Sequence, residues 1–265
     1  MNAPRNQSLI TPGSAVQLAG MVRVAPAADL ADVVEQRWIV AWDHRGRSPV
    51  TQEVLPDPCV NLAIEPAGVL VYGVTSGRSV HVLAGAGTVV GTKFRPGGFS
   101  GFAPGPVRAL NDRTPPPSEV VGSDEDRLEG ELARAKTTRV LIEVVNTFLR
   151  AHRPPAVPER ALVFEIVSAM RAAAPGTRVS EVASSFAMSP RTLQRLFAEH
   201  VGAGPKQVLQ RFRHQDATDR LAAHGRADEG GLARLAAELG YFDQAHFIHD
   251  FRVATGRLPS TLIGT

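Results

Sequence analysis

The chain has 265 residues, a formal net charge of +3 and one cysteine. This length allows two domains with substantial cores, and one cysteine excludes an intrachain disulfide. The sequence has neither a signal-peptide-like apolar run at its start nor a run near the about 20 apolar residues of a membrane-spanning helix. We therefore expect a cytoplasmic protein without a membrane partner.

The positive excess is confined to the C-terminal part of the chain. Residues 160–265 contain 13 Lys and Arg against 10 Asp and Glu, whereas residues 1–159 contain 16 of each. Apart from Lys206, the basic residues of this part are arginines. Because a guanidinium group can contact guanine or phosphate with two hydrogen bonds, this composition is compatible with nucleic-acid binding.

Short runs rich in β-branched and aromatic residues occupy the chain from about residue 37 to residue 101, separated by Pro, Gly and Asp. Such spacing predicts an antiparallel β-sandwich or small barrel. The predicted strands are residues 37–42, 59–64, 69–74, 80–83 and 88–94.

Helical periodicity replaces the strand pattern after a Pro-rich strip at residues 104–117. Apolar residues recur every three or four positions between residues 125 and 150, which predicts a helical segment at about 120–150. The Pro-rich stretch 151–158 then breaks the helix. The predicted domains are therefore 1–157, β-rich with a helical end, and 158–265, all helical; the overall class is α+β.

One pattern occurs twice between residues 179 and 265. Each copy has a small residue, Ala183 or Ala236, where two helices would cross closely, and a corner residue four places later. The corner residues are Ala187 and Gly240. Since Gly tolerates the positive φ of a tight corner, the first copy is the less favourable one. A second helix follows each corner, so the pattern predicts two helix-turn-helix units.

The starts and spacing of the second helices support this prediction. Ser189 and Asp243 are suitable N-caps, and apolar residues at helical spacing follow both. A helix over residues 204–225 would join the units. Roughly twenty residues at about 1.5 Å each span about 30 Å, close to the ~34 Å between successive major grooves.

Several single residues and short runs, distributed over the two units and the end of the chain, carry a family resemblance. They are Ala183, Leu193-Gln194-Arg195-Leu196-Phe197, Gly240-Tyr241, Asp243-Gln244-Ala245-His246-Phe247, Phe251, Thr255-Gly256 and Pro259-Ser260. Together they resemble the DNA-binding domain of the AraC/XylS family of bacterial transcription regulators, across residues 160–260. The resemblance implies sequence-specific binding to double-stranded DNA, with the second helix of each unit in the major groove.

By position, the resemblance implies base contacts from both second helices and phosphate contacts near their starts. The predicted DNA-binding residues are Ser189, Arg191, Thr192, Gln194 and Arg195 in the first unit, and Asp243, Gln244, His246 and His249 in the second. Two departures concern the second unit: His249 stands where the family usually has Arg, and the ending after Pro259 lacks the usual Tyr-Arg.

The β-rich part more loosely resembles the cupin-like sensor domains that precede the DNA-binding half in many such regulators. This implies a small-molecule effector, and RNA polymerase as a partner if the protein is an activator. The helical segment at 120–150 lies where such regulators often form homodimers. Packing of these helices on their own barrel is an equally open interpretation.

A ligand pocket has candidate residues in the β-rich part. Alternation places Trp38 and Trp42 on one face of a strand, and Lys93 and Arg95 could line the same pocket. The same face could also be ordinary core. We keep both interpretations.

Other chemistry-bearing residues have simpler explanations. Cys59 lies in an apolar strand pattern, where a small buried residue is expected. His44 and His81 lack His-x-His spacing, so we expect neither a metal nor a cofactor. Glu53 and Asp57 could form an acid pair, but Asp57 lies between two prolines, which favours a turn.

Two other classes of function stay open. One is an enzyme in the N-terminal barrel with the helical half as an accessory, and the other is a module that acts through protein partners alone. An enzyme needs a convergent acid, base or metal set, and the sequence shows neither this nor a phosphate-binding Gly loop or nucleophile elbow. We therefore expect a protein that is not an enzyme.

Overall fold

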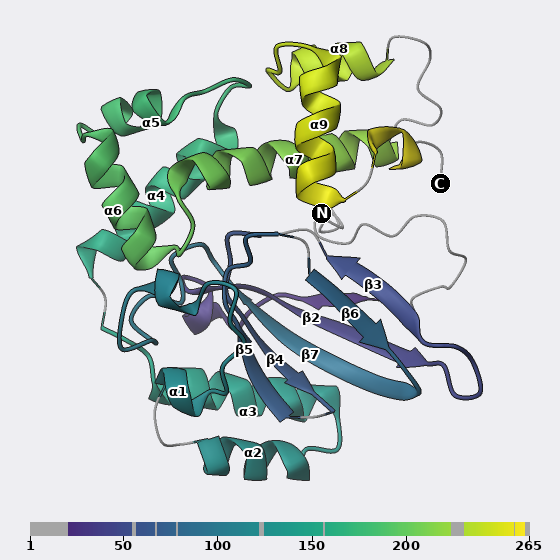
Figure 1. Cartoon of the computed structure of the whole chain (residues 1–265). Helices are drawn as coiled ribbons and strands as arrows, with labels where there is room; N and C mark the ends of the chain where they lie inside the picture. The colour runs from purple at the N-terminus through teal and green to yellow at the C-terminus, as the bar shows by residue number, and fades with distance from the viewer. Residues whose placement is uncertain are drawn as a thin grey trace.

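The computed structural model describes residues 21–54, 57–66, 68–77, 79–121, 125–155, 157–223, 231–256 and 258–262. A β-rich N-terminal part lies beneath an all-helical C-terminal part (Figure 1). The α+β class predicted from the sequence is confirmed. Among the described helices, none combines the length and the apolar character needed to cross a bilayer.

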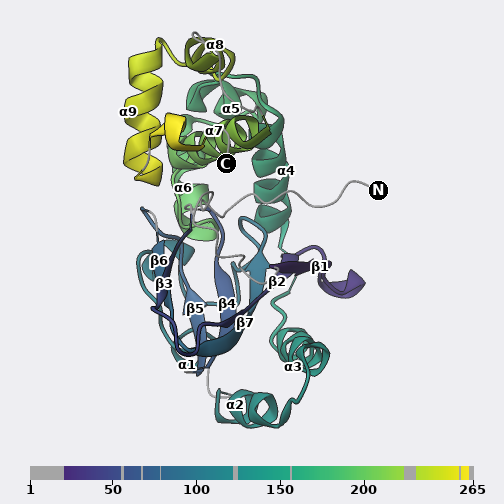
Figure 2. The same cartoon turned by 90° about the vertical axis from the view of Figure 1, so that its right-hand side faces the viewer.

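The β-rich part contains two antiparallel sheets. Its strands are β1 (Val22–Val24), β2 (Val34–Asp43), β3 (Val50–Val54), β4 (Asn61–Glu65), β5 (Gly68–Tyr72), β6 (Ser79–Leu83) and β7 (Ala86–Phe94). One sheet has the order β1-β2-β7-β4-β5, and β3 pairs with β6 in the other. Seen side-on, the β3–β6 ribbon lies on one side of the larger sheet and helices lie on the other (Figure 2). The predicted antiparallel sandwich is thus present, with β1 and β3 as strands that the sequence pattern did not reveal.

The two faces of the larger sheet differ in character because successive side chains alternate between them. One face carries Leu62, Val71 and Val90, which are almost fully buried, and Leu62 and Val71 belong to a cluster that includes Val145 and Leu149 of α3. The other face carries polar and aromatic side chains, considered below. Burial of the apolar face therefore anchors the sheet on its helices.

The helices of the N-terminal part are η1 (Ala28–Leu30), η2 (Val107–Leu110), α1 (Ser118–Val121), α2 (Glu125–Arg134) and α3 (Thr138–Ala151). The predicted helical segment is divided at residues 135–137. Thr137 caps α3, its hydroxyl accepting a hydrogen bond of 3.3 Å from the Val140 amide. An N-cap of this kind stabilises a new helix start.

The C-terminal part contains α4 (Pro158–Ala172), α5 (Val179–Ser185), α6 (Pro190–His200), α7 (Pro205–Ala223), α8 (Gly231–Glu238), α9 (Gln244–Thr255) and η3 (Pro259–Leu262). The predicted joining helix is α7, and α5–α6 and α8–α9 are the two predicted units, called here the first and second unit. The domain boundary at residues 157/158 stays a prediction.

In the described part of the chain, buried apolar residues form two separate clusters. The larger runs from the β-sheet through α3 and α4 to Leu193 and Phe197 of α6 and Phe212 of α7. The smaller is built by the second unit on the C-terminal half of α7, with Ala217, Leu221, Ala236, Leu239, Tyr241, Phe247 and Phe251. The first unit is thus continuous with the β-rich core, whereas the second unit has an apolar core of its own.

Candidate nucleic-acid interface

The corners of the two units share one backbone geometry. Ala187 has φ 53° and Gly240 has φ 74°, so both are left-handed. In each unit the residue after the corner donates its amide hydrogen to the buried Ala: Met188 to Ala183 at 3.0 Å, and Tyr241 to Ala236 at 2.9 Å. The left-handed conformation of Ala187 confirms that the first corner is the less favourable one, and both Ala183 and Ala236 are buried.

The second unit has one residue more between its corner and its second helix. Ala183 and Ala236 are 53 positions apart, whereas Phe197 and Phe251, which fill equivalent core positions, are 54 apart. The additional residue is Phe242, whose side chain is 93% exposed. An aromatic side chain therefore projects into solvent immediately before α9.

Side-chain oxygens cap both second helices. The Ser189 hydroxyl accepts from the Thr192 amide at 3.1 Å, and the Asp243 carboxylate accepts from the His246 amide at 2.7 Å. The Ser189 and Thr192 hydroxyls also lie 2.9 Å apart. Capping satisfies backbone N–H groups that a helix start otherwise leaves unpaired.

The polar faces of α6 and α9 are open to solvent. Exposed side chains include all the predicted reading residues, namely Arg191, Gln194 and Arg195 on α6 and Gln244, His246 and His249 on α9. The two helices stand across α7, α6 at its N-terminal end and α9 over its C-terminal half (Figure 1), and in the view of Figure 2 both lie to the left of α4. One surface can therefore approach both helices together.

The two faces are not equivalent in composition. Aligned on their buried positions, Arg191, Gln194 and Arg195 of α6 correspond to Ala245, Ile248 and His249 of α9. The α9 face consequently has fewer hydrogen-bond donors and no fixed positive charge at these positions.

A partly buried polar network fixes α9 on α7. The Asp250 carboxylate accepts hydrogen bonds from His214 at 3.0 Å and from the Tyr241 hydroxyl at 2.8 Å. The hydrogen bond from His214 is the main reason that the pKa of Asp250 falls to about 2. The Arg213 guanidinium lies over the Tyr241 ring at 5.1 Å, within cation–π range. Together these contacts set the orientation of α9.

The β-rich part touches the C-terminal end of α6 directly. The Asn111 amide donates to the Gly202 carbonyl at 2.6 Å, and Ser100 and His200 share a hydrogen bond of 2.6 Å. Gly202 has φ +83°, and a Cβ there would lie 2.9 Å from Asn111 Oδ1. A larger residue at Gly202 would therefore push the two parts of the chain apart.

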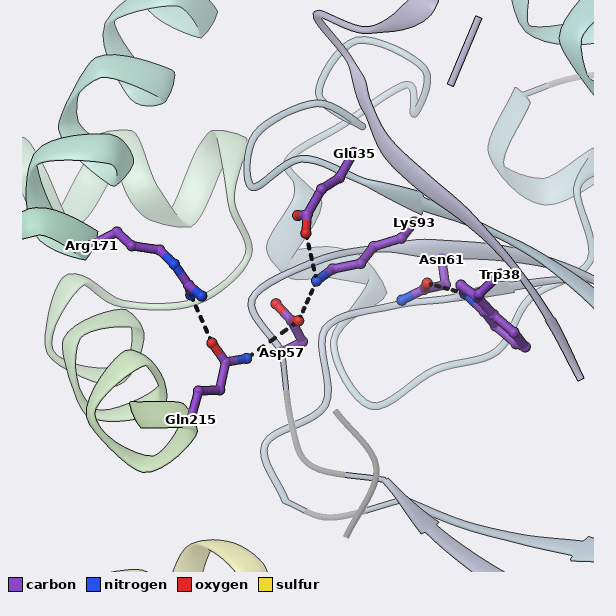
Figure 3. Close-up of polar contacts among 7 residues, drawn as sticks. All are labelled: Glu35, Trp38, Asp57, Asn61, Lys93, Arg171 and Gln215. Carbon is purple, nitrogen blue, oxygen red and sulfur yellow. Dashed lines mark hydrogen bonds and ion pairs between the residues drawn. The ribbon is translucent and has the colours of Figure 1, made fainter. Parts of the chain in front are cut away.

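A polar chain joins the β-rich part to α7 and α4 (Figure 3). Lys93 Nζ contacts Asp57 at 2.6 Å and Glu35 at 3.1 Å. The Gln215 amide of α7 lies 3.4 Å from Asp57 and accepts from Arg171 of α4 at 2.8 Å. Burial is the largest single effect on Lys93 and Asp57 and favours their neutral forms, but the combined charges and hydrogen bonds around them, led by their mutual attraction, leave the Lys93 pKa raised and the Asp57 pKa lowered.

Sequence reasoning missed the role of Asp57. Its carboxylate forms an ion pair with Lys93, whereas the sequence pattern indicated only a turn. Pro56, one of the two prolines on which the turn was predicted, lies outside the described residues. The partners of Asp57 in this chain are 36 and 158 positions away, so local sequence carries no signal for them. Cys59 is buried, as expected for a small core residue.

The predicted ligand residues are brought together in part. Trp38 donates to Asn61 at 3.1 Å, and Asn61 pairs in register with Lys93, so these three share one face of the sheet (Figure 3). Trp42 lies farther along the same face, opposite Gly87. Arg95 lies beyond the end of β7, where its side chain is exposed and donates to the Ala31 carbonyl at 2.7 Å.

The described residues contain no group of three or more His, Cys, Asp or Glu side chains placed to hold a metal ion. His81 instead packs edge-on against Tyr72, with ring centroids 5.8 Å apart. His44 is buried.

The paired corners, capped second helices and shared open face define a helix-turn-helix DNA-binding domain. Residues 182–264 match a family model described as a helix-turn-helix domain, and residues 22–116 match one described as a domain of unknown function, DUF6597. The C-terminal part is thus a helix-turn-helix domain of the AraC type.

Two transcriptional activators illustrate the similarity of this domain. The chain is 31% identical over 81 residues to the HTH-type transcriptional activator RhaS of Pectobacterium atrosepticum, covering 31% of this chain and 28% of that protein. It is 32% identical over 73 residues to the XylDLEGF operon transcriptional activator 1 of Pseudomonas putida, covering 28% of this chain and 22% of that protein. The match thus spans less than a third of each relative.

Solved structures of ToxT from Vibrio cholerae align along most of the chain. One covers 91% of this chain and 96% of its own, with 10% sequence identity and a TM-score of 0.40.

Proposed function

We propose that the protein is a sequence-specific, non-catalytic transcription regulator that binds double-stranded DNA in the cytoplasm. The observation that carries this proposal is the exposure of α6 and α9 on one side of α7. At about 1.5 Å per residue, the 19 residues of α7 span about 28 Å. This length is compatible with placing the two helices, as recognition helices, in successive major grooves about 34 Å apart.

The first recognition helix supplies most of the base discrimination in this proposal. Arg191, Gln194 and Arg195 would contact base edges, and Arg pairs with guanine through two hydrogen bonds. On α9, Gln244, His246 and His249 would form weaker contacts because a histidine is mostly neutral at pH 7. Backbone N–H groups that the caps leave free at the helix starts near Ser189 and Asp243, together with the Thr192 hydroxyl, would hold phosphates.

The test uses the full chain. DNA fragments selected from a random pool by the wild-type protein are titrated at several salt concentrations with wild type, Arg195→Ala and Arg47→Ala. Arg47 is an exposed arginine in the loop between β2 and β3 and serves as the charge-matched control. Loss of a base contact costs about 1–3 kcal/mol, roughly a 5- to 150-fold weaker affinity, and relaxes preference at one base position.

Arg47→Ala should bind like the wild type. Equal binding by all three proteins would overturn the assignment of α6, and failure to select any DNA sequence would overturn the proposed function.

A small-molecule effector is the second part of the proposal. The face shared by Trp38, Asn61 and Lys93 supports it because Lys93 is connected to α7 through Asp57 and Gln215. A ligand that moved Lys93 would thereby act on the helix that carries both units. Trp42 and Arg95 would contribute at the margins.

Pairing of two copies and contact with RNA polymerase complete the proposal. The helices α2 and α3 project from the β-rich part (Figure 2), and Val140 on α3 is 42% exposed. We expect Val140→Glu to lower the mass of the protein in light scattering if α3 mediates a homodimer. An unchanged mass would exclude this surface.

A further inference from the structure

A crevice of about 210 Å³ lies where the β-rich part, α7 and α9 meet. Its walls include Ser76 from the loop after β5, Gln207, Gln210 and Arg211 from α7, and Asp250 and Val253 from α9. In Figure 1 the lower end of α9 extends past α7 toward the sheet. The crevice is distinct from the Trp38–Lys93 face, since none of those residues lines it.

Arg211 is the feature of the crevice that points to a ligand. The side chain is 7% exposed, and its Nη2 donates to the Thr75 carbonyl. Its Nη1 is buried without a hydrogen-bond partner among the described residues. Buried donors without an acceptor are rare in native proteins, so an acceptor from a bound molecule would complete the site.

The acidic groups around Arg211 are already occupied by other partners. Asp57 accepts from Lys93, and Asp112 accepts from the amide and hydroxyl of Ser76 at 2.7 and 3.1 Å. Asp250 accepts from His214 and Tyr241. None of these carboxylates forms a hydrogen bond with Arg211 in the described structure, which leaves the guanidinium available to an added oxyanion.

Two side-chain amides supply further donors. Gln207 uses its carbonyl oxygen to accept from the Gly204 amide at 2.8 Å, so its NH₂ group remains for a ligand. Gln210 follows on the same side of α7 and also lines the crevice. A guanidinium with two amides matches the acceptor oxygens of a carboxylate or phosphate group.

We propose that this crevice binds a small molecule bearing a carboxylate or phosphate group, held by Arg211 with Gln207 and Gln210. Such a ligand would touch the loop at Ser76, α7 and the end of α9 together. Because the second unit has its own apolar cluster, the ligand would restrict its motion relative to the β-rich part. The effect on DNA rests on the proposed function, whereas binding itself does not.

Binding is tested on the full chain without DNA, by following thermal unfolding. The probes are inorganic phosphate and glycerol 3-phosphate in one arm and acetate and succinate in the other, each compared with sodium chloride at equal ionic strength. A ligand that binds the native state raises the melting temperature in a saturable manner. A rise in either arm supports the proposal and identifies the oxyanion.

Three variants locate the site. Arg211→Gln removes the charge, and Val253→Trp fills the crevice from a position that is 71% exposed and should tolerate replacement. Arg139→Gln is the distant control. We expect the saturable rise in melting temperature to vanish in Arg211→Gln and Val253→Trp and to persist in Arg139→Gln.

If Arg211→Gln does not fold, Val253→Trp alone tests the site. Its folding is first verified by a cooperative thermal transition in sodium chloride. No saturable rise with any probe, or an equal rise in Val253→Trp, overturns the site. In a second step, the active probe is added to DNA titrations. A change of affinity in the wild type that Val253→Trp lacks supports coupling, and unchanged affinity despite binding overturns coupling alone.

Discussion

The two corners predict opposite effects of exchanging Ala and Gly. At Ala187, φ 53° places an L-residue in the left-handed region, which costs about 1–2 kcal/mol. Ala187→Gly removes this strain, while the greater freedom of Gly in the unfolded chain opposes it by about 0.4–1 kcal/mol. We expect a net stabilisation of about 0.5–1 kcal/mol.

At Gly240 the reverse change meets two obstacles. The residue has φ +74°, and a Cβ would lie 2.5 Å from the Gly176 amide nitrogen and 2.8 Å from the Pro175 carbonyl carbon. These are backbone atoms of the α4–α5 connection and cannot rotate away. Strain of about 1–2 kcal/mol and overpacking of about 1–3 kcal/mol together exceed the entropic gain of about 0.4–1 kcal/mol. Gly240→Ala should lose about 2–4 kcal/mol.

The assay is urea unfolding combined with amide hydrogen exchange, which reports each unit separately. Ala187→Gly should increase protection of α5 and α6, and Gly240→Ala should lower protection of α8 and α9 while leaving the β-sheet unchanged. Destabilisation by Ala187→Gly, or a loss below about 1 kcal/mol in Gly240→Ala, would refute the reasoning.

Three further predictions follow from the polar contacts and the exposed aromatic residue. Lys93 and Asp57 form an ion pair whose side chains are 9% and 13% exposed, so Lys93→Met should lower the free energy of unfolding in urea by about 3–5 kcal/mol. The double variant Lys93→Met with Asp57→Asn should lose less stability than the sum of the losses in the two single variants. Additive losses would contradict the pairing. Since the folded pKa of Asp250 is about 2, below the ordinary about 3.9, its contribution is present above pH 4 and lost as the pH falls toward 2. Asp250→Asn should remove this acid dependence from the melting temperature, whereas the control Asp216→Asn, at an exposed position, should retain it. Parallel curves of melting temperature against pH for Asp250→Asn and the wild type would exclude the effect. Phe242→Ala should change stability by less than about 0.5 kcal/mol yet weaken DNA binding, with Phe242→Tyr as control; unaltered DNA binding would show that the side chain lies outside the interface.

The helical part could be predicted well because its determinants are local. Ala183, Ala187 and the capping Ser189 lie within one short stretch, and the apolar positions of α6 recur with the helical period. The extra Phe242 also has a sequence signal, since the alanine spacing and the phenylalanine spacing of the two units differ by one residue. The predicted length of the joining helix, which is α7, had also indicated that both second helices could face one DNA duplex.

The β-rich part was harder because its determinants are distant in sequence. The three-residue strand β1 is defined by pairing with β2, and β3 by pairing with β6. The contact of Asp57 with Gln215, and that of Arg211 with Thr75, join residues more than 130 positions apart. Pattern analysis sees neither strand register nor such contacts, so it placed Trp38 and Lys93 on plausible faces but could not connect them to α7.

The gap between the two apolar clusters falls within a single turn of α7. Phe212 belongs to the larger cluster and Ala217 to the smaller. The intervening turn instead uses Arg213, His214 and Gln215 for its polar contacts with Tyr241, Asp250 and Asp57. Small changes in the backbone torsions of this turn would change the direction of α9 relative to α6 without exposing either apolar cluster to solvent. The second unit would therefore rotate relative to the first about this turn. The range of that rotation would determine how much the spacing between the two half-sites of an operator can vary.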